Sequence, residues 1–156
     1  MLGLIGPVNT HMYLTQAAGS SPIVNAFQAG SLHVNPVKPD TIAKSIAIGN
    51  PADGYYALMA ARQSGGGACA VTDEEAIAGM KLLAQTEGIF AEAVGGVVVG
   101  ALRKLAASGS IKRNQLTVAF ITGAGPKTQE IVADVVRPFT IQPTLESFEE
   151  VLSVPA

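Results

Sequence analysis

Apolar and polar positions alternate along this chain in blocks that have either strand or helix character. Four short apolar runs predict strands, at 12–15, 68–71, 116–121 and 139–141. The blocks between them repeat apolar residues every three or four positions, which predicts helices at 22–28, 53–64, 72–88, 93–107, 128–135 and 144–152. The segment 41–48 fits a helix in its first half and a strand in its second half, and both assignments stay open.

Local signals mark where several of these helices begin and end. Ser20-Ser21-Pro22 is suited to cap and start the first helix, because proline at the first turn loses no hydrogen bond. Thr72 and Glu75 form a capping box ahead of the third helix, and Gly88 closes it. Alternating strands and helices predict an α/β fold, a single three-layer domain with a mostly parallel sheet flanked by helices.

Composition narrows this picture to one domain with a covered surface. The 156 residues fit one α/β domain over 1–156, with 1–11 as a ragged start. Only 14% of the residues are charged, against about 25% in an average soluble domain. We therefore expect a second copy, a neighbouring domain or a ligand to cover part of the surface.

Charge and cysteine content exclude several classes of partner. The net charge is −2 and the ten Lys and Arg residues are scattered singly, so we expect neither nucleic acid nor a membrane surface as a partner. The apolar start, 1–8, lacks a basic region and is broken by Gly and Pro, unlike a signal peptide. A single cysteine, Cys69, and no zinc spacing favour a cytoplasmic chain without a structural metal.

The run at 116–121 ends in Thr122-Gly123-Ala124-Gly125, which is the chemistry-bearing stretch of the chain. Open α/β sheets bind ligands at the carboxyl ends of their strands, so Thr122 is a candidate contact. The stretch is not a nucleotide loop. A P-loop needs glycine before Lys-Ser/Thr, where this chain has Pro126, and the dinucleotide fingerprint lacks its third glycine.

Few other residues suggest chemistry. His11 and His33 stand in polar or loop contexts and are expected at the surface, and Cys69 is expected to be a small buried apolar residue. Glu92 precedes the helix at 93–107. Its carboxylate can cap free N–H groups of that helix or project into a cleft, and both roles stay open.

Six short stretches follow one another with natural spacing: 15–19, 45–54, 64–67, 70–75, 87–92 and 121–125. Together they resemble the C-terminal portion of threonine synthases, in the β-type (fold type II) family of pyridoxal phosphate enzymes. The resemblance extends from about 12 to 152. It implies a reaction that converts O-phosphohomoserine and water to threonine and phosphate.

The same resemblance implies roles for five residues at the cofactor. Thr122 matches the hydroxyl that hydrogen-bonds the pyridine nitrogen, with Gly123 beside it. Glu92 approaches the cofactor side of the cleft, and the backbone of Gly49 and Asn50 lies near the ring. A neutral hydroxyl at the ring nitrogen does not enforce a protonated pyridinium, and so tunes how strongly the ring withdraws electrons.

The chain departs from the family pattern in ways that predict half a site. The family's Schiff-base lysine and phosphate-binding loop lie upstream of the matched residues, and none of the six lysines at 38, 44, 81, 104, 112 and 127 stands in a matching context. Ala93, Ala124 and Pro126 replace residues that are usual in the family.

These departures lead to one expectation and two alternatives. We expect a truncated threonine synthase-like chain that does not catalyse alone and does not bind pyridoxal phosphate covalently. The alternatives are a non-catalytic homo-oligomeric binding or assembly module and a small metabolite-binding regulatory domain. The expected partner is a second copy or a missing N-terminal pyridoxal phosphate domain.

Overall fold

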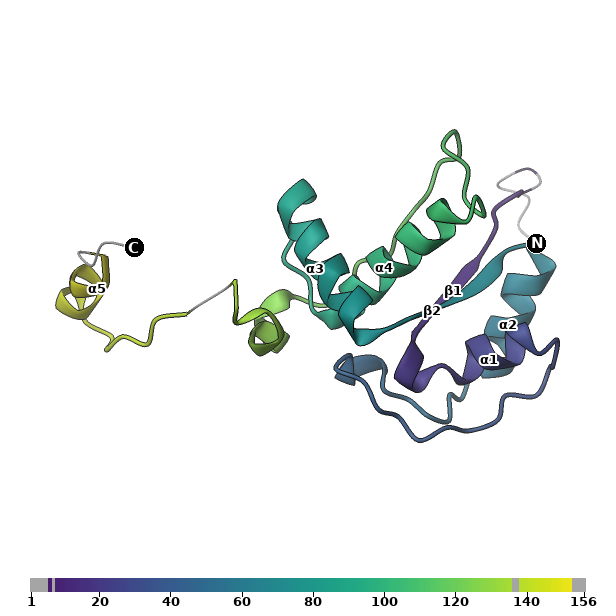
Figure 1. The fold of residues 1–156 in the computed structure, drawn as a ribbon, viewed down its shortest axis with the longest axis horizontal. Helices are drawn as coiled ribbons and strands as arrows, with labels where there is room; N and C mark the ends of the chain where they lie inside the picture. Colours follow the sequence, from purple (N-terminus) through teal and green to yellow (C-terminus); the bar gives the residue numbers. More distant parts are fainter. Residues whose placement is uncertain (1–5, 7, 136–137, 153–156) are drawn as a thin grey trace.

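The computed structural model describes residues 6, 8–135 and 138–152, and its centre is a parallel sheet (Figure 1). Strand β1, Tyr13–Ala17, pairs with β2, Gly67–Val71, in a register that runs from Tyr13 opposite Gly67 to Ala17 opposite Val71. Both strands lie where the apolar runs predicted them. Among the described residues these two strands make up the whole sheet.

Helices cover the two faces of this sheet, which confirms the α/β fold class. Figure 1 shows α1, Pro22–Gln28, and α2, Gly54–Gln63, on one side. Helices α3, Asp73–Glu87, and α4, Ala93–Ala107, lie on the other, and α4 contacts both strands. A turn of 3-10 helix, η1 at Ala18–Ser20, joins β1 to α1.

The first helix is capped from a place that the sequence pattern did not indicate. Ser21 precedes α1, but its side chain makes no capping hydrogen bond. Instead, Oε1 of Gln16 accepts hydrogen bonds from the backbone N–H groups of Ile23 and Val24, at 2.9 and 3.0 Å. A strand residue therefore satisfies the free donors of the helix, and the predicted serine cap is wrong.

Helix α3 begins and ends as its sequence predicts. The Thr72 hydroxyl accepts from the N–H of Glu75 at 3.2 Å, and the Glu75 carboxylate accepts from the N–H of Thr72 at 2.9 Å. Gly88 ends the helix in the left-handed conformation, with φ 67°. Both halves of the capping box are formed, so the chain leaves β2 in a defined direction.

Helices α3 and α4 pack closely because glycines line their contact. A Cβ atom added to Gly79 would meet the carbonyl oxygen of Gly96, and one added to Gly96 would meet the carbonyl oxygen of Ala76. The absence of side chains at these positions thus allows the two helices to approach each other closely. Between these helices and the sheet lies the core, which includes Val71, Met80 and Val97, each at most 1% exposed.

The C-terminal third differs from the prediction. Residues 116–121 and 139–141 form no strand in the part of the chain that the structure describes. Leu116, Val118 and Phe120 are 96%, 71% and 72% exposed. A strand is stabilised by a neighbour that pairs its backbone groups, and neither β1 nor β2 pairs with this segment. The strand predictions are therefore wrong for this chain as it stands.

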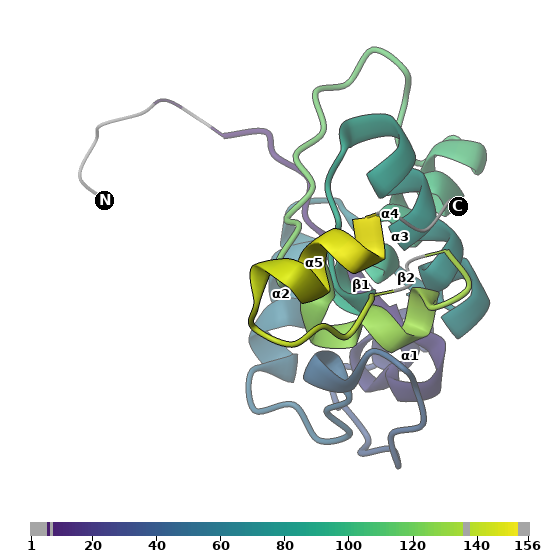
Figure 2. The ribbon, with the colours of Figure 1, turned by 90° about the vertical axis from the view of Figure 1, so that its left-hand side faces the viewer.

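Two further segments form short 3-10 helices. The ambiguous segment 41–48 contains only η2, Lys44–Ile46, so neither alternative holds over its length. The helix predicted at 128–135 is replaced by η3, Gly125–Val132, which is kinked at Thr128. The last predicted helix is present as α5, Leu145–Leu152, and stands away from the sheet in Figure 1. Figure 2 shows the molecule from the side on which α5 lies, with α5 facing the viewer.

Candidate functional site

The N-terminal end of α4 brings together three segments that are distant in sequence. Glu92 immediately precedes α4 and is buried, with 8% of its surface exposed. Its side chain makes no capping hydrogen bond to the helix. Instead, Oε1 accepts a hydrogen bond from the Ser45 hydroxyl at 3.2 Å. Of the two roles left open by the sequence, capping is therefore excluded, and the carboxylate projects away from its own helix.

The loop at 123–125 is fastened to the same place by backbone hydrogen bonds. The N–H of Glu92 donates to the carbonyl of Gly123 at 3.2 Å, and the N–H of Gly125 donates to the carbonyl of Phe90 at 2.9 Å. Between these bonds, Ala91 and Ala124 form an isolated antiparallel bridge. The exposed segment therefore ends in a fixed position beside α4.

Gly123 is required at its position for two independent reasons. Its φ is +79°, in the left-handed region that favours glycine. A Cβ atom there would also run into the carboxylate of Glu92, which occupies the space above the Gly123 backbone. Glu92 and Gly123 thus form one packed unit.

The other predicted site residues lie at varying distances from this unit. Thr122 precedes Gly123, and its side chain is exposed. Gly49 contacts a different loop, because its carbonyl accepts from the N–H of Val37 at 3.0 Å and an added Cβ would meet the Val37 carbonyl. Asn50 is exposed. The structure therefore joins Glu92 with Gly123 directly and Thr122 by adjacency, and does not join Gly49 or Asn50 to them.

Ser45 forms a cluster with Glu92 and Gly123, and the sequence pattern did not reveal its part in it. It lies within the matched stretch 45–54, but no local signal assigns it a partner 47 residues away. Its loop is tied to α3, since the Thr41 hydroxyl donates to Oδ1 of Asp73 at 2.5 Å. The N–H of Ile42 donates to Oδ2 of the same carboxylate at 3.1 Å. Asp73 therefore anchors the segment that presents Ser45.

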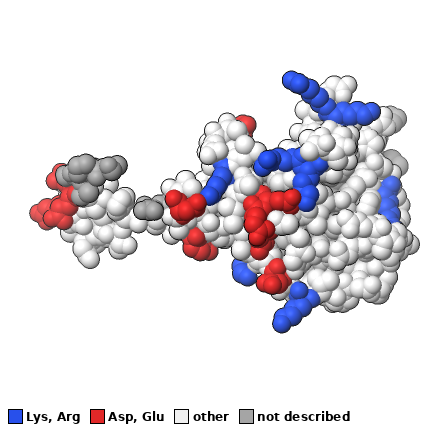
Figure 3. Space-filling model, viewed as in Figure 1, with Lys and Arg blue, Asp and Glu red and all other residues white. Residues whose placement is uncertain are grey.

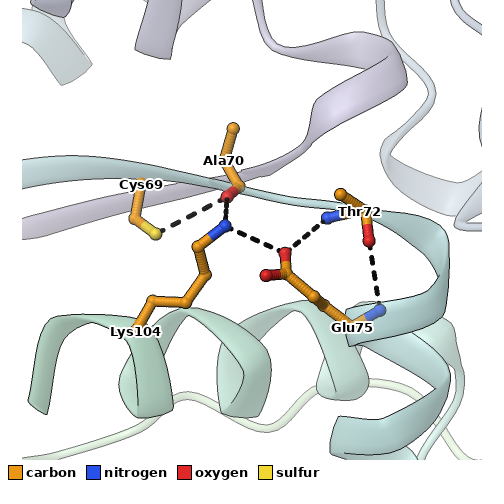
Figure 4. Close-up of polar contacts among 5 residues, drawn as sticks. All are labelled: Cys69, Ala70, Thr72, Glu75 and Lys104. Carbon is orange, nitrogen blue, oxygen red and sulfur yellow. Dashed lines mark hydrogen bonds and ion pairs between the residues drawn. The ribbon is translucent and has the colours of Figure 1, made fainter. Parts of the chain in front are cut away.

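A second polar cluster lies at the end of β2 and is structural (Figure 4). Lys104 of α4 donates to the Ala70 carbonyl at 3.0 Å and to Glu75 at 2.9 Å. The backbone hydrogen bond from Thr72, with help from Lys104, lowers the pKa of Glu75 below its ordinary value. Burial raises the pKa of the Cys69 thiol, which fits the predicted role of a small buried residue.

The described residues offer neither a membrane span nor a metal site. None of the helices described is both long and apolar enough to cross a membrane. Nor does any group of three or more His, Cys, Asp or Glu side chains within the described ranges offer a metal site.

Comparison with known proteins identifies the family. The family described as "Pyridoxal-phosphate dependent enzyme" matches residues 2–123. The chain belongs to this family. It is 40% identical over 139 residues to the threonine synthase of Methanosarcina acetivorans, an alignment that covers 88% of this chain and 34% of that protein. Over 90 residues it is 49% identical to the threonine synthase of Halalkalibacterium halodurans, covering 58% of this chain and 25% of that protein.

The chain thus spans between a quarter and about a third of the length of these curated relatives. A solved crystal structure of a threonine deaminase from T.th. shares the fold, with a TM-score of 0.52 and 16% sequence identity. The match covers 63% of this chain and 35% of the deaminase chain. These findings confirm the predicted resemblance, and this pyridoxal-phosphate family member is threonine synthase-like.

The cluster contains groups suited to only one side of pyridoxal phosphate. The Thr122 hydroxyl and the glycine loop at 123–125 suit the edge of a pyridine ring. The cofactor phosphate would need cations or a cradle of N–H groups, but the nearest charged group in the cluster is the Glu92 carboxylate. Among the described residues, no lysine lies within hydrogen-bond distance of Glu92; Lys81 and Lys104 pair with Asp134 and Glu75. The residues present fit the ring edge and do not fit the aldehyde or phosphate ends.

Proposed function

We propose that this chain supplies the ring side of a pyridoxal phosphate site in a threonine synthase-like enzyme, and that a second segment supplies the lysine and the phosphate loop. The observation that supports this most is the joining of Glu92 with Gly123 at the end of α4, because the resemblance independently assigns both residues to the cofactor. The reaction proposed for the assembled enzyme converts O-phosphohomoserine and water to threonine and phosphate.

Four of the five predicted residues have a proposed task at the cofactor in this half site. The exposed Thr122 hydroxyl is free to turn toward a pyridine nitrogen, and the Gly123 conformation sets the direction of the loop that carries it. The Gly49 and Asn50 backbone would line the ring if their loop shifts toward Glu92 on assembly. When bound, pyridoxal phosphate supplies the electron sink that withdraws charge from the substrate's reacting carbons.

By itself the chain is proposed to be inactive. The described lysines lie at the surface or in ion pairs, and none of them forms a hydrogen bond or an ion pair with Glu92. Adding pyridoxal phosphate should therefore give no lysine-linked absorbance band. A band that disappears when one of the six lysines is replaced would contradict this proposal.

The decisive experiment supplies the missing segment in trans. The lysine-bearing portion of the 40% identical Methanosarcina acetivorans relative would be expressed separately and mixed with this chain. Phosphate release from O-phosphohomoserine should require both parts. Thr122→Ala should reduce this activity at least about tenfold, as expected when an interaction worth about 1.4 kcal/mol is lost in the transition state. Thr117→Ala, five residues upstream on the exposed segment, serves as the matched control and should leave activity unchanged.

One observation favours the second candidate function, a non-catalytic homo-oligomeric module. The alternate residues Leu116, Val118 and Phe120 are exposed, and they form an apolar row on an extended segment without a neighbour. A second copy could cover this row by pairing along it. Sedimentation of the chain alone would then give a dimer that Val118→Lys dissociates, and mixing with the lysine-bearing portion would give no activity.

Both proposals place the protein in the cytoplasm, without nucleic acid or membrane partners. The distribution of charge supports this. Figure 3 shows Lys and Arg side chains dispersed among acidic ones on the face drawn, rather than collected in a stripe. Fractionation of cells and a nucleic-acid gel-shift measurement would test the two parts of this expectation.

A further inference from the structure

We propose that Ser45 is a positioning residue that holds the Glu92 carboxylate over Gly123 and thereby fixes the loop that presents Thr122. What this loop binds rests on the proposed function, whereas the positioning itself can be tested on the chain alone.

Burial gives the Ser45–Glu92 contact its importance. Glu92 is 8% exposed, so little water reaches its carboxylate. The Ser45 hydroxyl donates to Oε1 at 3.2 Å, across a gap of 47 residues in sequence. A buried carboxylate needs donors, and loss of one leaves it to seek another orientation. The hydroxyl therefore selects one orientation of this side chain.

The backbone on both sides of Ser45 is itself held in place by hydrogen bonds. The residue lies on η2, Lys44–Ile46, where the N–H of Ile46 donates to Ala43 and that of Ala47 to Lys44. Thr41 and Ile42, just upstream of Ser45, both donate hydrogen bonds to Asp73 on the first turn of α3. Two ordered elements, α3 and α4, thus meet through Asp73, Ser45 and Glu92.

On the other side, the carboxylate contacts the loop that contains Thr122. It fills the space where a Cβ of residue 123 would stand, and the backbone of Glu92 bonds the Gly123 carbonyl at 3.2 Å. A carboxylate that leaves this position would remove the packing above Gly123. The loop could then adopt other conformations, and Thr122, its neighbour, would change direction with it.

Carbonyl ¹³C NMR of the full chain tests this chain of contacts. The Glu92 side-chain signal would be assigned as the one lost in Glu92→Gln. In Ser45→Ala this signal should shift, and exchange of the Glu92 amide proton should accelerate about fivefold, the effect of losing one net hydrogen bond. Ser45→Thr keeps a hydroxyl and should restore both readings. Because Ser45 is exposed, the alanine variant should fold normally.

Two further variants make the result specific. Ser108→Ala removes another exposed hydroxyl, at the other end of α4, which donates to the Leu105 carbonyl at 3.0 Å. It should leave the Glu92 signal unchanged. Asp73→Asn, which weakens the anchor of the Ser45 loop, should shift the Glu92 signal in the same direction as Ser45→Ala. An unchanged Glu92 signal in Ser45→Ala, or an equal shift in Ser108→Ala, would overturn the proposal.

The assembled enzyme provides a separate measurement. In the trans experiment, Ser45→Ala should lower kcat with little change in KM. The variant should change the direction of the loop that carries Thr122 without removing a contact to the substrate. If the mixture is inactive with the unmodified chain, the proposed function fails. The NMR result would still decide whether Ser45 positions Glu92.

Discussion

Strand β2 and the segment 116–121 are similar apolar runs with opposite outcomes. In β2, Cys69 is 8% exposed and Val71 is fully buried, and the strand pairs along its length with β1. In 116–121, three large side chains are exposed and no strand forms. A capping box follows β2 at once and turns α3 and α4 back over it. The comparison shows that an apolar run forms a buried strand only where the fold supplies a neighbouring strand and helices to cover it. The run by itself does not determine whether these neighbours are present.

The largest expected effect tests the close packing that covers β2. Gly79→Val would drive a branched side chain into the Gly96 carbonyl, and we expect a loss of about 3 kcal/mol in the free energy of unfolding. Ala78→Val, on the exposed side of the same helix, should cost less than about 1 kcal/mol. Urea denaturation measures both. Equal losses would show that packing between α3 and α4 is not what protects the strand.

The next effect compares the two apolar runs directly. Val71→Ala removes buried methyl groups from the core and should cost about 2 to 3 kcal/mol. Val118→Ala truncates an exposed side chain and should change stability by no more than about 0.5 kcal/mol. Thermal and urea unfolding of both variants would provide the values. A large cost at Val118 would mean that the segment is covered in solution, as by a second copy.

A smaller effect is expected where β2 turns into α3. Thr72→Ala removes the hydroxyl that accepts from the N–H of Glu75, which should destabilise the chain by about 1 kcal/mol. No equivalent cap follows 116–121 in the described part of the chain. Chemical denaturation should therefore show the loss for Thr72→Ala, while Thr122→Ala should be neutral within about 0.5 kcal/mol. A cost at Thr122 as large as that at Thr72 would contradict this difference.

The smallest effect depends on pH. The hydrogen bond from Thr72, and then Lys104, lowers the pKa of Glu75 in the folded chain. A lowered folded pKa means that this stabilisation is present above the unfolded pKa and is lost as pH falls through the folded value. Glu75→Gln should cost about 0.5 kcal/mol at neutral pH, because the Lys104 and Glu75 side chains are 43% and 38% exposed and solvent screens their attraction. The cost should vanish in acid, whereas that of Thr72→Ala should persist; denaturation at several pH values would show both.

The sequence predictions succeeded where the interacting residues are close in sequence and failed where they are not. Helix α4 spans the predicted residues, and α3 has its predicted box and glycine stop, because these signals act within one or two turns. The cap of α1 was missed because its acceptor, Gln16, belongs to the preceding strand. Of the five residues that the sequence named for the site, the structure brings Glu92 and Gly123 into contact, while their role at a cofactor stays a prediction. Ser45 was missed because its partner, Glu92, lies 47 residues away in sequence.

The sequence by itself determined the family, the bounds of most helices and both strands of the sheet, and it named the residues of the proposed half site. These depend on hydrogen bonds between near neighbours and on motifs that stand in order along the chain. Tertiary structure alone decided that Glu92 turns away from its helix toward Ser45 and Gly123, and that 116–121 stays unpaired. The physical reason is that the orientation of a carboxylate depends on the hydrogen-bond donors that the folded chain brings near it. In the same way, an apolar run pairs as a strand only if the fold places another strand beside it.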